Sequence, residues 1–278
     1  MAETDKLKAI LDALPGPNAQ GTFADLDKDK VEWAIPEIAK GGAAFVVGLV
    51  ERLVEPGKGD DVKAHYALHA LAVHLSGLED DKPRAEFART VAAQLAGDRP
   101  PGVKQYLIQQ LQVAGGAEAV AAIAPFLADE SLCETAALVL VAIGQGAAEA
   151  LRAALPKVPP ACRLVIVQNL GAVRDAASVD ALRQALADAD AQVRLAAAWG
   201  LARLADPGAV EPLLKAADAE GWERFRATEA CLTLAEGLLA AGKKAEATKV
   251  LTHLRDTRTD PAERHVREAA ERALAAGT

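Results

Sequence analysis

The chain has 278 residues, of which 51% are hydrophobic and only 4% aromatic, and its formal net charge is −8 at pH 7. Alanine and leucine, which favour helices, supply most of the hydrophobic residues, whereas strands depend on β-branched and aromatic residues. An acidic chain repels phosphate groups, which argues against a general nucleic-acid binder and against docking on an anionic membrane. The composition therefore predicts an all-α protein.

The start of the chain carries no sign of export. Residues 1–16 lack the apolar run of about 7–15 residues that a secretory signal requires. The longest apolar stretches, 43–50 and 136–143, are much shorter than the roughly 18–20 residues that cross a bilayer. We therefore expect a soluble, cytoplasmic protein.

Two helix pairs are expected before the clearest part of the pattern. A helix near 3–13 and a loop at 15–23 come first, as an N-terminal cap. The first pair, 29–55, is expected to pack around Trp33, Ile35, Phe45, Val46 and Leu49, and a longer pair follows at 60–97.

The clearest pattern lies at residues 188–218. Its first half carries an apolar stripe at helical spacing, formed by Val193, Ala197, Gly200, Leu201 and Leu204. Asp206, Pro207 and Gly208 then break the helix, and a second stripe follows at Val210, Leu213, Leu214 and Ala217. Two helices this short are marginal alone, so each must bury its stripe against the other and against neighbouring pairs.

The same pattern recurs upstream. A step of 31 residues carries Leu201 to Leu170 and Asp206 to Asp175, and a step of 90 carries Leu201 to Leu111. Repetition of a two-helix unit at about 30 residues is the signature of an α-solenoid. Unit boundaries are expected near Pro101, Glu130, Pro160 and Asp190.

The end of the chain fits more loosely. Residues 222–256 read as a long helix pair broken at Gly242, and an amphipathic, charged helix near 260–276 supplies the polar outer face that a terminal repeat needs.

Residues 190–206, DAQVRLAAAWGLARLAD, resemble the short bacterial HEAT repeats that are related to phycobilisome lyases. Gly200, Ala202 and Ala205 depart from the usual pattern, but each exchanges one small residue for another. The resemblance covers residues 101–218 most clearly. It implies an α-α superhelix of about seven HEAT-type helix pairs at 29–257, with caps at 1–28 and 258–278, as one domain over 1–278.

A basic column marks the start of the first helices, at Lys104, Arg163, Arg194 and Arg226. In HEAT proteins the equivalent arginine pairs with the acidic residue just before it, here Asp190, which implies a structural ladder between units. A strip that binds phosphate or acidic groups is the alternative.

An acidic column follows the same period, at Glu118, Glu149, Asp180 and Glu211. Each residue is expected in the first turn of a second helix, where a carboxylate favours the positive end of the helix dipole by roughly 0.3–1 kcal/mol. The alternative is a negative strip that binds a partner, together with Arg183 and Lys215.

Other chemistry-bearing residues are few. Trp199 either fills space between units or serves as an exposed anchor for a partner. His65 and His69 have the spacing of metal ligands but lack a third ligand, and the three cysteines form no CxxC pair. The sequence has no glycine-rich phosphate loop and no nucleophile elbow. No metal, cofactor or catalytic residue is therefore expected.

These observations favour a non-enzymatic scaffold or adaptor that binds a protein or peptide, with the acidic column pointing to a basic segment in the partner. The alternative is a HEAT-type accessory enzyme, either a lyase-like chaperone for a prosthetic group or an enzyme that acts on nucleic acid. The sequence does not indicate the oligomeric state.

Overall fold

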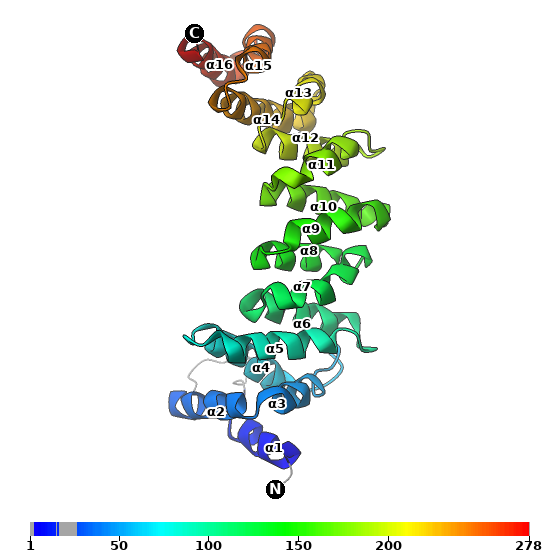
Figure 1. Ribbon diagram of the computed structural model, residues 1–278, viewed down its shortest axis with the longest axis vertical. Coiled ribbons are helices and arrows are strands. Elements are labelled where there is room, and N and C mark those ends of the chain that lie inside the picture. The colour runs from blue at the N-terminus through cyan, green and yellow to red at the C-terminus, as the bar shows by residue number, and fades with distance from the viewer. Residues whose placement is uncertain (1–2, 15, 17–26, 278) are drawn as a thin grey trace. The chain divides into compact units, whose positions relative to one another are not determined.

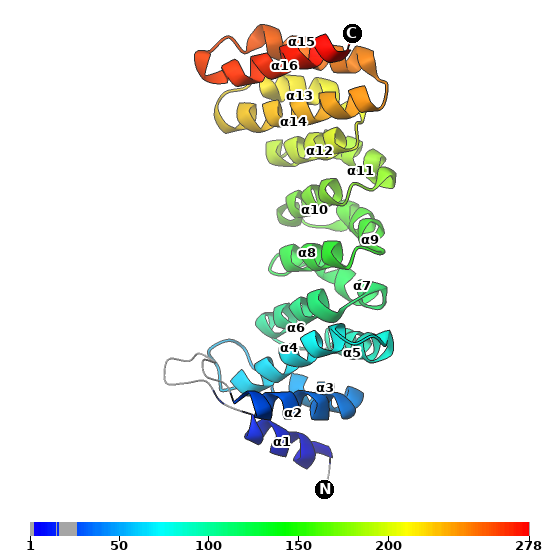
Figure 2. The ribbon, with the colours of Figure 1, turned by 90° about the vertical axis from the view of Figure 1, so that its left-hand side faces the viewer.

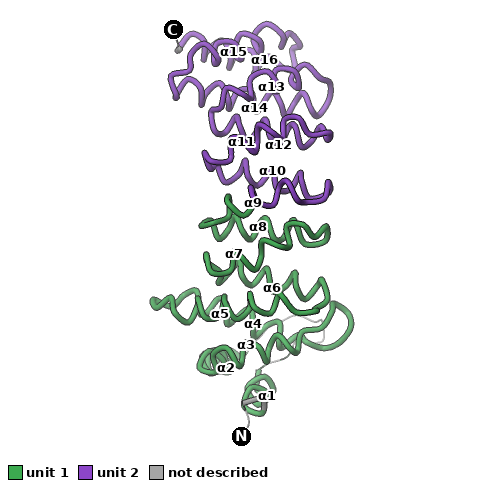
Figure 3. Tube along the Cα trace, turned by 45° about the vertical axis from the view of Figure 1, so that its right-hand side comes forward, with its two compact units in different colours: residues 1–150 green, residues 151–278 purple. Residues whose placement is uncertain are grey.

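The computed structural model describes residues 3–14, 16 and 27–277, and the regular structure in this part of the chain is helical throughout, with no strand (Figure 1). This confirms the all-α prediction. Residues 1–150 and 151–278 form two compact units, which we call the N-unit and the C-unit (Figure 3). Except for Gly16, the loop expected at 15–23 lies outside the described residues.

The N-unit begins with a single helix that is followed by helix pairs. Its α-helices are α1 (Glu3–Ala13), α2 (Lys28–Lys40), α3 (Gly42–Val50), α4 (Val62–Ser76), α5 (Asp81–Gln94), α6 (Pro101–Ala114), α7 (Ala117–Ile123) and α8 (Cys133–Ile143). The helix α9 (Ala147–Ala154) spans the end of this unit and the start of the next.

The C-unit continues the alternation of first and second helices. Its α-helices are α10 (Pro160–Val173), α11 (Val179–Ala185), α12 (Ala191–Arg203), α13 (Val210–Ala217), α14 (Gly221–Ala240), α15 (Lys244–Thr257) and α16 (Arg264–Gly277). In Figure 2, α10 and α12 lie one above the other, and α11 stands beside them.

The expected boundaries agree with the structure. Pro101 and Pro160 are the first residues of α6 and α10, where proline loses no helical hydrogen bond. Asp190 is the N-cap of α12, and its Oδ1 accepts a hydrogen bond from the Gln192 amide at 2.8 Å. The boundary expected near Glu130 falls just before α8, which begins at Cys133. The single domain over 1–278 and its caps stay predictions.

Aspartates are the N-caps of three short 3₁₀ turns in the C-unit. Asp175 caps Ala177, Asp206 caps Gly208 and Asp260 caps Ala262, in each case two residues ahead at the start of a short 3₁₀ turn. Because the carboxylate satisfies an amide that the helix leaves without a partner, each turn is fixed locally by its sequence.

The core of the C-unit lies between successive first helices. Leu170 and Leu201 are fully buried, as the repeat pattern predicts. Gly171 and Gly200 meet where α10 packs on α12, and a Cβ built on Gly171 would lie 2.8 Å from the Cα of Gly200. Gly200 thus occupies a close helix approach, as expected for a small residue in that position.

The first helix pair of the N-unit packs around Ile35, Phe45, Val46 and Leu49, which are buried as expected, but the expectation for Trp33 is wrong. Trp33 is 50% exposed, whereas Ala34, Ile35 and Ile38 of the same helix are buried. These three residues form the face of α2 that turns to the core, and Trp33 lies outside that face.

Among the described residues, no single helix is both long and apolar enough to cross a membrane. The bent pair α2 and α3, with 111° between the two helices, meets the length and composition criteria only when its members are taken together.

Candidate binding surface

The acidic column lies where the repeat predicts. Glu118, Glu149, Asp180 and Glu211 occupy the first turns of α7, α9, α11 and α13, respectively. In the N-unit, Glu118 Oε1 accepts a hydrogen bond from Arg84 Nη1 at 3.2 Å, while Glu149 is exposed. Each carboxylate therefore lies at the positive end of a helix dipole, and Glu118 also joins α7 to α5.

In the C-unit the two acidic positions differ in their surroundings. The Asp180 side chain is 89% exposed, and its nearest cation is Arg183 Nη1 at 3.9 Å. Glu211, by contrast, forms an ion pair with Lys249 of α15. Asp180 is therefore the acidic position whose charge is presented more openly to solvent.

Arg183, which the sequence placed on the partner-binding side, is held by the protein itself. Its Nε and Nη2 donate to the two carboxylate oxygens of Asp206 at 3.1 and 2.7 Å, and this contact raises the pKa of Arg183. One repeat earlier, Arg152 pairs with Asp175. These two pairs, each 23 residues apart, form a structural ladder that joins one repeat to the next.

The basic column does not form the expected ladder. Arg163 Nη1 lies 3.2 Å from Asp188 Oδ2, but Arg194 donates to the backbone oxygens of Asp188 and Ala189 at 2.8 and 2.9 Å. Asp190 caps α12 and is therefore not the partner of Arg194.

The two other members of the basic column have still different contacts. Lys104 Nζ lies 5.7 Å from the centre of the Phe126 ring, and Arg226 pairs with Glu229 at 3.3 Å within α14. The column is thus a recurrence in sequence without a shared contact.

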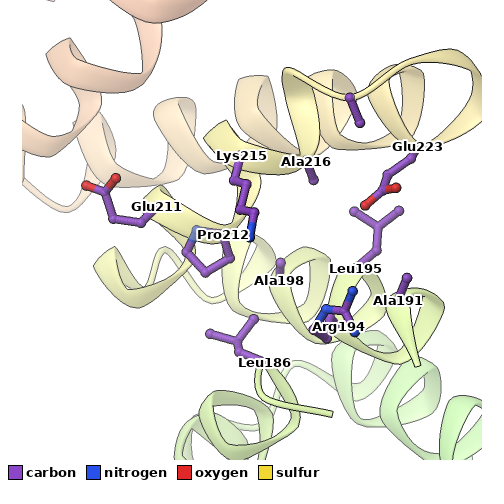
Figure 4. Close-up of a pocket in the computed structure, with 11 residues that line it drawn as sticks. Leu186, Ala191, Arg194, Leu195, Ala198, Glu211, Pro212, Lys215, Ala216 and Glu223 are labelled. Carbon is purple, nitrogen blue, oxygen red and sulfur yellow. The ribbon is translucent and has the colours of Figure 1, made fainter. Parts of the chain in front are cut away.

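Two of the open grooves in the described part of the C-unit lie beside the second helices α11 and α13. Groove I has a volume of about 420 Å³, and its lining includes Leu155, Arg163, Asp180, Ala181, Gln184 and Asp188. Groove II has a volume of about 490 Å³, and its lining includes Leu186, Arg194, Glu211, Pro212, Lys215 and Ala219 (Figure 4). Each of these six positions in groove II is 31 residues after its counterpart in groove I. The grooves are therefore the same site in consecutive repeats.

Figure 4 shows how the charged side chains lie around groove II. Lys215 and Arg194 extend toward the hollow from α13 and α12, and Glu223 extends toward it from the start of α14. Glu211 lies at the far end, with its carboxylate directed away. The interior of groove II is thus lined by two cations and one carboxylate above an apolar floor.

The sequence of residues 148–233 matches the family of HEAT repeats. This segment contains all the residues that line grooves I and II. Residues 148–233 are HEAT repeats.

Among solved structures, an engineered protein is 22% identical over 98% of this chain and 78% of its own, with a TM-score of 0.44. The complex of CpcE and CpcF of phycocyanin lyase from Nostoc sp. PCC7120 is 17% identical over 82% and 94%, with a TM-score of 0.41. The archaeal HEAT-like repeats protein from Thermococcus onnurineus NA1 is 12% identical over 99% and 98%, with a TM-score of 0.39. No curated protein matches the sequence. Because these TM-scores are all below 0.5, none of the likenesses decides the function.

Within the HEAT repeats, Trp199 of α12 packs against the preceding first helix, α10. A Cβ on Gly171 would lie 3.2 Å from Cε3 of the indole, and the Arg203 guanidinium lies 4.6 Å from the ring centre. These contacts favour the space-filling role over the anchor role. In the C-unit, Trp222 and Phe225 are openly exposed, with exposed fractions of 60% and 66%. Neither residue was among those predicted from the sequence to bind a partner. Their three-residue spacing in a charged helix was the available signal.

The histidines and cysteines lie apart from the grooves. His65 Nδ1 lies 3.0 Å from Asp61 Oδ2, and His69 Nδ1 lies 3.0 Å from Gln110 Oε1. No cluster of three or more His, Cys, Asp or Glu that could hold a metal occurs in the described ranges. Cys133, Cys162 and Cys231 are all buried, and burial raises the pKa of Cys231 to about 12.

Proposed function

We propose that the chain is a non-enzymatic scaffold that binds a protein or peptide partner on the surface beside the second helices α11 and α13. The observation that carries this proposal is the recurrence of one open groove, at the same position, in two consecutive repeats. Repetition produces a broad and regular surface, which suits an extended partner better than a small molecule held in a single pocket.

The charged groups around the grooves also support binding over catalysis. Arg163 is tied to Asp188, and Arg194 is tied to two backbone oxygens. A catalytic site requires a nucleophile or base whose partner orients it toward a reacting atom. Here, both arginines instead bind the loop between α11 and α12. The side chains of Asp180, Gln184 and Lys215 are exposed and therefore accessible to a binding partner.

A basic segment in the partner is supported by charge. The chain carries a net charge of −8, and Asp180 presents its carboxylate at the rim of groove I. Opposite charges increase the rate of encounter between two proteins, and salt weakens this attraction.

Photo-crosslinking from inside the grooves tests the proposal. A photoreactive residue placed at Gln184 or at Lys215 should crosslink the same protein in the native lysate, and one placed at Gln168, an exposed residue of α10 outside both grooves, should not. Crosslinks to unrelated proteins from the two grooves, or equal crosslinking from Gln168, contradict the proposal. A crosslinked prosthetic group or nucleic acid would favour the accessory-enzyme alternative.

A further inference from the structure

Grooves I and II share their register but differ in charge at two equivalent positions. Gln184 of groove I is replaced by Lys215 in groove II, and Asp188 of groove I is replaced by Ala219. Both replacements make groove II more positive than groove I. The other charged side chains around each groove determine the sign of its net charge.

Groove I presents a negative charge. Its two arginines, Arg152 and Arg163, each form an ion pair, with Asp175 and Asp188 respectively. Asp180 is left at the rim, 89% exposed, and its neighbour Arg183 already donates two hydrogen bonds to Asp206. A positively charged side chain is therefore favoured in groove I.

Groove II presents a positive charge. Arg194 has no carboxylate at the position of Asp188, because that position is Ala219, and it donates only to uncharged backbone oxygens. Lys215 adds a second cation, and Glu223 offsets one of the two. Glu211 pairs with Lys249 and points away from the groove. A negatively charged side chain is therefore favoured in groove II.

The distance between the grooves follows from the helix packing. Groove I borders α10 and groove II borders α12, and these helices pack directly on each other through Gly171 and Gly200. Packed helices lie about 8–10 Å apart, so the grooves repeat at about that distance. A β-strand places residues i and i+2 on one face about 6.8 Å apart, which is too short. A polyproline II helix places residues i and i+3 on one side about 9.3 Å apart, which fits.

We propose that grooves I and II bind two side chains of one extended partner segment, a basic one in groove I and an acidic one in groove II, three residues apart in a polyproline II conformation. This inference rests on the proposed function and specifies the partner segment. The apolar floors, with Leu155 and Leu186 at equivalent positions, accept the aliphatic stems of the two side chains.

Synthetic proline-rich peptides and the isotope-labelled full chain test this proposal by NMR titration. One peptide carries arginine and glutamate three residues apart, a second carries two arginines three residues apart, and a third carries arginine and glutamate two residues apart. The first should shift the amide signals of Gln184 and Lys215 and bind about two- to fivefold more tightly than the other two, as expected for one exposed charge pair.

Two substitutions made together in one variant make groove II resemble groove I. Combining Lys215→Gln with Ala219→Asp should remove the advantage of the arginine–glutamate peptide and favour the peptide with two arginines. Lys58→Gln, an exposed lysine of the N-unit, is the matched control and should leave the ranking unchanged. Circular dichroism confirms that each variant is folded.

An equal affinity for the three peptides, or an unchanged ranking in the double variant, overturns the inference. The absence of signal shifts in both grooves at millimolar peptide also overturns it. None of these three results contradicts the proposed function, because the crosslinks are made to the natural partner and do not depend on the peptide sequence.

Discussion

Gly171 and Gly200 form a close approach between two neighbouring first helices of the C-unit, and a Cβ on Gly171 would lie 2.8 Å from the Cα of Gly200. The same Cβ would lie 3.2 Å from the indole of Trp199. Helix α10 therefore rests on α12 with backbone against backbone. Neither helix has room for one more carbon at this point.

Gly171→Ala and Gly200→Ala should each lower the free energy of unfolding, since a methyl group forced into a packed interface costs about 1–3 kcal/mol. Urea unfolding followed by circular dichroism measures the loss. Gly77→Ala is the matched control, because its Cβ would meet nothing closer than a backbone oxygen at 3.6 Å. A stability of Gly200→Ala equal to that of the control would show that the two helices separate at no cost.

Asp206 has two roles that separate variants can distinguish. It caps the Gly208 amide at 2.8 Å and binds the Arg183 guanidinium through both oxygens. Asp206→Ala removes both contacts and should cost about 1–3 kcal/mol, whereas Arg183→Met removes only the half-exposed ion pair and should cost about 0.2–1 kcal/mol. Chemical denaturation of both variants and of the double variant gives the coupling energy. A coupling near zero would contradict the ladder.

Stability should fall in acid because of Glu263. Its carboxylate accepts hydrogen bonds from Arg224 Nε and Nη2 at 2.9 and 2.7 Å, and these bonds lower its pKa from the ordinary value of 4.5. A carboxyl whose pKa is lowered by folding contributes stability above its unfolded pKa and loses it as the pH falls through the folded pKa. Melting curves at a series of pH values should therefore show a smaller loss below pH 4.5 for Glu263→Gln than for the wild type. Parallel curves would contradict this assignment.

Much of the fold was predictable from sequence because its causes are local. The prolines that begin α6 and α10 and the aspartate that caps α12 act over a few residues, and the 31-residue period repeats such local signals along the chain. The burial of Leu170 and Leu201 follows from the same period.

The partners of charged side chains were less predictable. A helical wheel does not show that Arg183 reaches across the next turn to Asp206, or that Arg194 bonds to backbone oxygens and not to Asp190. Likewise, Arg258 falls at the start of the expected polar cap, yet it is fully buried and donates to Ala217 O at 2.7 Å. The contacts of long, flexible side chains depend on which groups lie near them in the folded chain, and a sequence pattern does not show this.

The most direct test of the binding surface is the association rate of Asp180→Lys with the partner found by crosslinking. Asp180 is 89% exposed, so the reversal should change stability by no more than about 0.5 kcal/mol. A scaffold that attracts a basic segment at groove I should associate more slowly after the reversal, and the difference should shrink as salt shortens the Debye length from about 10 Å at 0.1 M to about 3 Å at 1 M. An unchanged association rate together with a lowered melting temperature would show that the carboxylate serves only the helix end, and would contradict the account.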